Sequence, residues 1–332
     1  MGDDMFLALF GAIESGAIYA IMALGVYLSF RVLDFPDLTV DGSFVTGAAV
    51  AAFSIINGLS PIIGTILGTI VGFIAGCLTG ILHTKGKINA LLSGILMMIA
   101  LYSINLRIMG QPTLSLLNET TLKTQLVSLW QKTGIDQFFN NILTMLGLER
   151  FPTTWGIVFI MILVIVIIKI ITDYFLMTEV GLALRATGDN QRMIRSLSAN
   201  TDTLIIMGIG ISNGLVAFSG ALIAQHGGFA DVGMGIGMII IGLASVIIGE
   251  ALFGAKTIFR ATIAVILGAI IYRIVVTLAL RVDFLDTGDM KLITALLVVV
   301  ALVAPKMIQA QREKQRRQQK RASLSVEDVK NA

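Results

Sequence analysis

The chain has 332 residues, of which 56% are hydrophobic and only 14% are charged, and its formal net charge is +3. A water-soluble protein of this size needs more charge on its surface, so the composition excludes a soluble enzyme, a nucleic-acid-binding protein and a disordered chain. One cysteine and two histidines cannot build a disulfide framework or a His/Cys metal site. The sequence therefore predicts a polytopic membrane protein with no metal and no other cofactor.

Apolar runs long enough to cross a membrane recur along the chain. A bilayer core of about 30 Å needs about 20 apolar residues in a helix. Long runs occupy residues 5–30, 38–57, 62–82, 88–109, 153–175, 204–224 and 258–280, and shorter ones occupy 237–253 and 290–306. These runs are continuous and do not alternate, which excludes a β-barrel. We predict an all-α membrane bundle of about nine transmembrane helices, within a range of eight to ten.

Glycine is concentrated inside these runs. In the third run it recurs at four-residue spacing, at Gly64, Gly68, Gly72, Gly76 and Gly80. Small residues on one stripe of a helix let neighbouring backbones approach closely in a membrane. We therefore expect compact packing around this helix.

Lysine and arginine set the predicted orientation, because cytoplasmic loops of membrane proteins are enriched in these residues. The tail 306–332 holds eight of the 24 basic residues, and the loops around Lys85, Arg192 and Lys256 are also basic. The alternate loops carry aspartates, including those at 283–289. We expect the C-terminus and the basic tail in the cytoplasm and the N-terminus outside.

Two polar segments are longer than ordinary connections between helices. Residues 110–152 are expected to form an external segment with a short surface helix. Residues 178–200, TEVGLALRATGDNQRMIRSLSAN, are expected to lie inside and to form an amphipathic helix capped by Thr178. Its predicted apolar side consists of Leu182, Leu184, Met193, Ile194 and Leu197. Such a helix anchors at the membrane surface or docks a soluble protein, and the residues alone favour neither.

Two similar sequences interrupt the apolar runs. FPDLTVDGS, residues 35–43, and FADVGMGIG, residues 229–237, share the pattern Phe-x-Asp-aliphatic-x-apolar. The first lies at the inner side of the predicted topology and the second at the outer side, which is typical of inverted repeats whose broken helices meet near a substrate site. We expect the translocation path to be lined by Asp37, Asp41, Gly42, Asn213 and Asp231.

Other candidate chemistry is sparse. Glu14 lies inside the first apolar run and Glu250 ends a shorter one, and packing and function are both open for them. GEALFGAKT, residues 249–257, approaches a phosphate-binding loop, but Ala255 breaks the spacing and apolar helices flank it. We therefore expect no ATPase site and no enzymatic activity in this chain.

The segment GLALRATGDNQRMIRSLSAN resembles the coupling-helix segment of ABC-importer permeases of the branched-chain amino acid and ribose type, whose core is Gly–x–x–x–Arg–Ala–x–Gly–x–Asn. The matching positions are Gly181, Arg185, Ala186, Gly188 and Asn190. Residues 35–52 and 211–250 look like the same family, and the likeness covers most of residues 10–305. Its nearest branch is similar to amino-acid permeases, some of them for aromatic amino acids.

The resemblance implies a permease domain over residues 1–305, in the plasma (inner) membrane of a prokaryote. It also implies a dimer, two cytoplasmic ATP-binding subunits and an external substrate-binding protein. ATP-driven closure of those subunits would push on the coupling helix, and we expect Arg185, Asp189, Asn190 and Arg192 to make the contact. The binding protein would dock near 110–152, a segment longer than the resemblance leads us to expect.

Two other classes remain open at this stage. An ion-coupled secondary transporter would also use inverted repeats and broken helices, with Asp37, Asp41 and Asp231 as candidate ion ligands. A membrane scaffold without transport is the third class. The residues favour a neutral or zwitterionic small solute, and an amino acid is implied by the resemblance alone.

Overall fold

The fold is seen in a computed structural model that describes residues 2–132, 134–145, 150–280, 292–293, 295–296, 299–300 and 303. Most of the expected span 290–306, the loop 283–289 and the tail from 307 onward lie outside these residues. The elements in chain order are α1 (Gly2–Tyr27), the π-helix η1 (Leu28–Val32), α2 (Thr39–Ile56), α3 (Pro61–Thr84), α4 (Ala90–Met109), β1 (Thr113–Ser115), α5 (Leu122–Gln131), α6 (Ile135–Met145), α7 (Gly156–Met177), α8 (Glu179–Ser196), α9 (Thr201–Gly227), β2 (Phe229–Asp231), the 3-10 helix η2 (Val232–Gly235), α10 (Met238–Phe253) and α11 (Ile258–Ala279).

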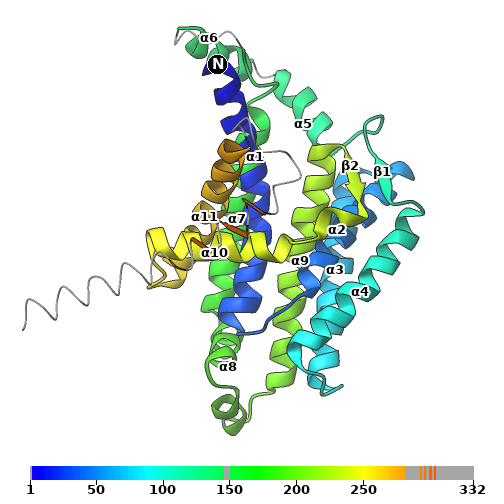
Figure 1. The fold of residues 1–332 in the computed structure, drawn as a ribbon, viewed down its shortest axis with the longest axis vertical. Helices are drawn as coiled ribbons and strands as arrows, with labels where there is room; N and C mark the ends of the chain where they lie inside the picture. Colours follow the sequence, from blue (N-terminus) through cyan, green and yellow to red (C-terminus); the bar gives the residue numbers. More distant parts are fainter. Residues whose placement is uncertain are drawn as a thin grey trace, which may run out of the picture.

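Long apolar helices form one bundle (Figure 1). Within the described residues, eight segments are long and apolar enough to cross a membrane: Asp4–Val32, Thr39–Ile56, Pro61–Thr84, Ala90–Met109, Gly156–Met177, Thr201–Gly227, Val232–Phe253 and Ile258–Ala279. They coincide with the first eight apolar runs, which confirms the predicted all-α membrane bundle. The ninth predicted run is the one that falls mostly outside the described residues.

The helix ends follow local sequence signals. The Ser60 side chain caps α3 by accepting a hydrogen bond from the Ile63 amide at 3.3 Å, and Pro61 occupies the first helical position, where its missing N–H costs nothing. Asn89 caps α4 in the same way. At the other end of a helix, Gly228 has φ +79° and closes α9 in the left-handed conformation that glycine adopts most easily.

The glycine stripe of α3 packs directly on α2 and α9. A Cβ atom at Gly68 would lie 2.7 Å from the carbonyl oxygen of Gly47 on α2. A Cβ atom at Gly72 would lie 2.1 Å from the Cβ of Ala217, and one at Gly76 would lie 2.4 Å from a backbone oxygen of α9. These distances are too short for any side chain, so the predicted close packing around α3 is confirmed.

The polar segments lie at opposite ends of the bundle. Figure 1 shows α5 and α6 at the end that holds the N-terminus, and α8 at the other end. The segment 110–152 contains more structure than the single surface helix expected, because β1 precedes α5 and α6. β1 pairs antiparallel with β2, with Thr113 opposite Asp231. α10 follows β2 and η2 and runs across the long axis of the bundle.

Candidate functional site

The first break, residues 33–38, joins η1 to α2 without regular structure. Pro36 has no backbone N–H and disfavours the helical conformation for the residue before it, so the helix cannot continue through this point. Asp34, with φ +51°, turns the chain in the left-handed region. A break was predicted over residues 35–43, and it is confirmed only in part, because residues 39–43 already belong to α2.

Asp37 fixes the first break to α9. Its carboxylate accepts a hydrogen bond from the Thr39 amide at 2.9 Å and one from Asn213 Nδ2 at 2.6 Å. Asn213 Nδ2 also donates to the Ile209 carbonyl oxygen at 3.0 Å. Asp37 and Asn213 are both fully buried. This pair is an internal polar link that holds the start of α2 against the middle of α9.

The second break, residues 229–237, consists of β2, η2 and the turn into α10. Asp231 shapes it by accepting hydrogen bonds from the Gly233 amide at 2.7 Å and from the Thr113 hydroxyl at 2.5 Å. Gly237, with φ +89°, precedes the first residue of α10. The break is thus tied to the segment 110–152 through the β1–β2 pair.

Asp41, the third residue of α2, connects the helix that follows the first break to the end of the second break. Its carboxylate accepts hydrogen bonds from the amides of Gly237 at 2.9 Å and Ile239 at 2.8 Å, at the N-terminus of α10. The first amides of a helix have no partner within the helix, and its N-terminus carries partial positive charge, so a carboxylate there satisfies both needs. Gly235 packs on the Asp41 backbone so closely that a Cβ would lie 2.1 Å from its carbonyl oxygen.

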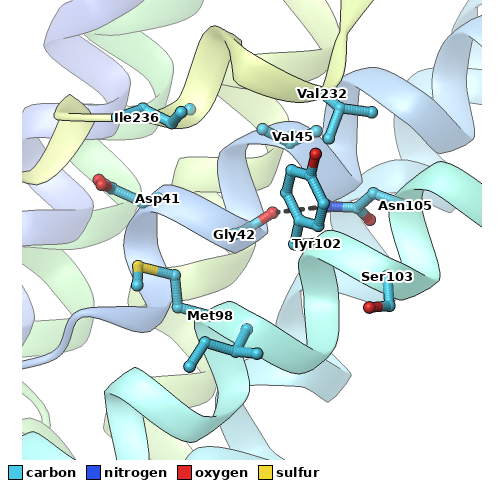
Figure 2. Close-up of a pocket in the computed structure, with 11 residues that line it drawn as sticks. Asp41, Gly42, Val45, Met98, Tyr102, Ser103, Asn105, Val232 and Ile236 are labelled. Carbon is cyan, nitrogen blue, oxygen red and sulfur yellow. Dashed lines mark hydrogen bonds between the residues drawn. The ribbon is translucent and has the colours of Figure 1, made fainter. Parts of the chain in front are cut away.

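A pocket of about 490 Å³ lies beside Asp41, between α2, α4 and the second break. We call it the break pocket. It is lined by Asp41, Gly42, Val45, Met98, Ile99, Tyr102, Ser103, Asn105, Val232, Gly235 and Ile236. Figure 2 shows Tyr102 extending from α4 toward the second break. Asn105 Nδ2 donates to the Gly42 carbonyl oxygen at 3.2 Å, and the Thr46 hydroxyl donates to Asn105 Oδ1 at 2.9 Å.

The chemistry of the break pocket suits a small organic solute. Its walls are mostly apolar, and its polar side chains are few: Asp41, Tyr102, Ser103 and Asn105. Asp41 is the one charged side chain among its eleven lining residues, all of which the structure describes. Pockets for small molecules commonly combine apolar walls with a few placed polar groups in this way.

The predicted pathway residues separate into three places. Asp41 and Gly42 line the break pocket. Asp37 and Asn213 are bonded to one another in the interior and do not line it. Asp231 lies in β2, where its two carboxylate oxygens accept hydrogen bonds from Thr113 of β1 and Gly233 of η2. The structure thus links the start of α2 to the second break through Asp41, while the part that each residue has in transport stays a prediction.

The segment after α7 forms α8, and Thr178 caps it as predicted, accepting from the Gly181 amide at 3.2 Å. The backbone departs from helical geometry at Asn190, with φ −153° and ψ 88°, so α8 has two parts. Arg185, Asp189, Asn190 and Arg192 are exposed, Ala186 is half-buried, and Gly181 is buried. The polar residues expected to contact a partner therefore lie on the free side of the helix.

The predicted apolar side of α8 is only partly right. Leu184 and Ile194 are buried, at 1% and 5% exposure. Leu182, Met193 and Leu197 are instead exposed at 60%, 48% and 69%. Leu182 and Leu184 are two residues apart, so they point to nearly opposite sides of the helix, and only one of them can face the bundle. The non-helical backbone at Asn190 separates them from Met193, Ile194 and Leu197.

Gly188 brings α8 against the first break. A Cβ atom at this position would lie 2.1 Å from the Val32 carbonyl oxygen, and 2.9 Å and 3.0 Å from two backbone atoms of Leu33. A second link crosses from the same region to α10, because Arg31 of η1 forms an ion pair with Glu250. Glu250, one of the two acids left open by the sequence, is therefore half of an ion pair.

Sequence reasoning missed several polar residues inside apolar runs. Asn105, Tyr102 and Ser103 of the break pocket were not predicted, although a polar trio within the run 88–109 was a usable signal. The buried ion pair between Lys169 and Asp173 of α7 was also missed. Its signal was an opposite-charge pair at four-residue spacing, which places both groups on one face of a helix.

Comparison with known proteins identifies the family. The family model described as "Branched-chain amino acid transport system / permease component" matches residues 8–303. The chain belongs to this permease family. Over 285 residues the permease is 42% identical to the tyrosine transport system permease protein of Clostridioides difficile (strain R20291), a match that covers 86% of this chain and 87% of that protein.

A second relative matches along nearly its full length. The permease is 33% identical over 308 residues to an uncharacterized protein of Rickettsia prowazekii (strain Madrid E), and the match covers 90% of this chain and 98% of that protein. No solved structure matches the chain. The resemblance found in residues 35–52, 181–200 and 211–250 is confirmed, and the chain is a multi-pass membrane protein of the branched-chain amino acid transport permease family.

Proposed function

We propose that this permease is the membrane subunit of an ABC importer and that it carries an amino acid into the cell. ATP hydrolysis on separate cytoplasmic subunits drives the transport. An aromatic amino acid is the first candidate, because a 42% identical relative is named as a tyrosine transport permease. The observation that carries the proposal is the contact of α8 with the first break at Gly188.

The proposed coupling runs through backbone contacts. An ATP-binding subunit presses on the free side of α8, at Arg185, Asp189 and Arg192. Because Gly188 has no side chain, a shift of α8 acts directly on the backbone where η1 ends and the first break begins, at Val32 and Leu33. Coupling of this kind requires a stiff connection between two sites and an element with two arrangements, which here is the pair of breaks.

The shift of the first break reaches the break pocket through the start of α2, which carries Asp41. The first break leads into α2, and the carboxylate of Asp41 holds the N-terminus of α10. Moving the start of α2 therefore moves one wall of the pocket relative to α4. In this scheme the pocket holds the substrate, and Asp37 with Asn213 keeps the break attached to α9.

The assembly contains two ATP-binding subunits, a second copy of the permease and an external substrate-binding protein. α8 and the C-terminus face the cytoplasm of a prokaryote, and the segment 110–152 faces outward, where the binding protein docks. The basic residues near Lys85 and in the tail favour this orientation.

Co-purification tests the proposal. The permease is expressed with its gene neighbours, purified in mild detergent and reconstituted in liposomes. We expect an attached ATP-binding protein whose ATPase rate rises when the external binding protein and an amino acid are added. Arg185→Glu should abolish the attachment of the ATP-binding protein, whereas Lys132→Glu, an exposed charge reversal next to α5 at the opposite end, should leave that attachment unchanged.

Two outcomes would overturn it. A bare permease that accumulates solute under a proton or sodium gradient would be a secondary transporter. A bare permease with no flux under any gradient would be a scaffold.

A further inference from the structure

A second pocket lies toward the end of the bundle that holds the N-terminus. We call it the outer pocket. It has a volume of about 240 Å³ between α1, α5 and the start of α7, and it is lined by Leu7, Phe10, Gly11, Glu14, Lys123, Val127, Phe151, Pro152, Thr153, Thr154 and Ile157. It shares no lining residue with the break pocket. Nothing in the proposed coupling scheme uses it.

Glu14 is the acid of this pocket, and it lies inside the membrane-spanning segment Asp4–Val32. It is half-buried, with Leu7, Phe10 and Ile157 among its neighbours in the lining. The structure gives its carboxylate no hydrogen bond and no ion pair with any described residue. An ionisable side chain within a membrane span is costly and usually faces a cavity or a functional partner. The position of Glu14 in the pocket lining therefore favours binding of a ligand over a purely structural role.

Lys123 of α5 is the positively charged residue in the lining of the same pocket. Its Nζ donates one hydrogen bond, to the His226 carbonyl oxygen at 3.0 Å, which fixes the ammonium group at the end of α9. An ammonium group has three donors, so two remain for a ligand. The two opposite charges line one cavity and yet do not bond to one another.

We propose that the outer pocket binds a zwitterionic α-amino acid, with its ammonium group on Glu14 and its carboxylate on Lys123. A simple cation is repelled by Lys123 and a simple anion by Glu14, so the pair selects a ligand that carries both charges. The ligand's side chain lies against Phe10 and Phe151. A volume below the range of about 300–1,000 Å³ for drug-sized ligands suits one free amino acid.

This ligand class agrees with the proposed function, but binding in the outer pocket does not depend on ATP-driven transport. Lys123 comes from the segment 110–152, and the outer pocket shares no lining residue with the break pocket, so the two are separate binding sites. It would hold an amino acid on the outer side of the pathway.

Equilibrium binding in detergent to the permease with its ATP-binding subunits, prepared without the external substrate-binding protein, tests the proposal. The probes are radiolabelled L-tyrosine, L-leucine and L-alanine, with tyramine and 3-(4-hydroxyphenyl)propionate as analogues of tyrosine that lack the carboxylate or the amine. We expect at least one amino acid to bind, and the analogue that lacks either charged group to bind about tenfold more weakly or worse, because hydrogen bonds to charged groups are the strong ones.

Two variants locate the binding. Glu14→Gln and Lys123→Gln each remove one charge with little change in size, and each should raise the Kd about tenfold or more. The matched controls are Glu119→Gln and Lys132→Gln, which remove the same charges elsewhere in the segment 110–152 and should leave the Kd unchanged. If Glu14→Gln does not fold, Lys123→Gln and the analogue series on the native protein still decide the question.

The proposal is overturned if none of the three amino acids binds, or if both site variants bind as tightly as the controls. It is also overturned if tyramine binds as well as L-tyrosine, because the site would then be a cation site. ATPase co-purification and uptake are measured on the same preparations. Intact ATP-driven uptake without outer-pocket binding would refute this site alone, whereas amino-acid binding without any ATPase would refute the proposed function alone.

Discussion

Asp41→Asn tests whether one carboxylate holds the two breaks together. Asp41 accepts the amides of Gly237 and Ile239 at 2.9 Å and 2.8 Å with different oxygens. Asparagine replaces one of those oxygens with an NH₂ donor, so one amide at the start of α10 faces another donor. A buried donor left unsatisfied costs about 1–3 kcal/mol, and losing the negative charge at a helix N-terminus costs about 0.3–1 kcal/mol more.

A total of about 2 kcal/mol makes local opening of the α10 N-terminus about 30-fold more populated. Hydrogen exchange on the peptide spanning 232–245 measures this directly, and the amides at 237 and 239 should exchange faster by that factor. Uptake should fall because the second break, which forms one wall of the break pocket, is held less firmly against α2. Asp202→Asn, a carboxylate at the start of α9, is the control and should leave this peptide unchanged. Native protection together with native uptake in Asp41→Asn would refute the reasoning.

Two further predictions concern α8 and α7. Gly188→Ala places a Cβ 2.1 Å from a backbone oxygen of the first break, an overpacking that costs about 1–3 kcal/mol, so solute imported per ATP hydrolysed should fall. Gly214→Ala, whose Cβ would meet its nearest neighbour at 3.5 Å, should keep the native ratio, and an equal ratio in both variants would contradict the coupling scheme. Lys169→Met or Asp173→Leu alone strands a buried charge and should lower stability by about 3–5 kcal/mol, whereas the double variant should recover most of the unfolding temperature and keep uptake. A well-folded double variant without uptake would show that the ion pair has a role in transport.

The spans were predictable because apolar length is the property that a bilayer selects. Local signals were equally reliable. Thr178 caps α8 because its hydroxyl can reach an amide three residues later, and Pro36 prevents a continuous helix because it has no N–H and its ring clashes with the helix backbone. The glycine stripe of α3 predicted close contact because no other residue allows it. Each of these features depends on residues that are neighbours in the sequence or on one helix face.

The partners of Asp41 could not be predicted in the same way. They lie 196 and 198 residues away in the sequence, and the shared pattern of the two breaks indicated their proximity but no bond. The apolar side of α8 was partly wrong for a different reason. At a membrane surface an apolar side chain such as Leu197 can face lipid or another subunit, so hydrophobic periodicity does not report the interior of this chain alone.

The contacts of α3 with α2 and α9 have a mechanical consequence. Where backbone meets backbone, as at Gly68 and Gly72, no side chain can change rotamer to absorb a displacement. These three helices should therefore move as one rigid body. If the break pocket opens to the other side of the membrane, the rest of the bundle must then rotate relative to α2, α3 and α9. The first break, with Gly188 pressed against it, is the place where such a turn would begin.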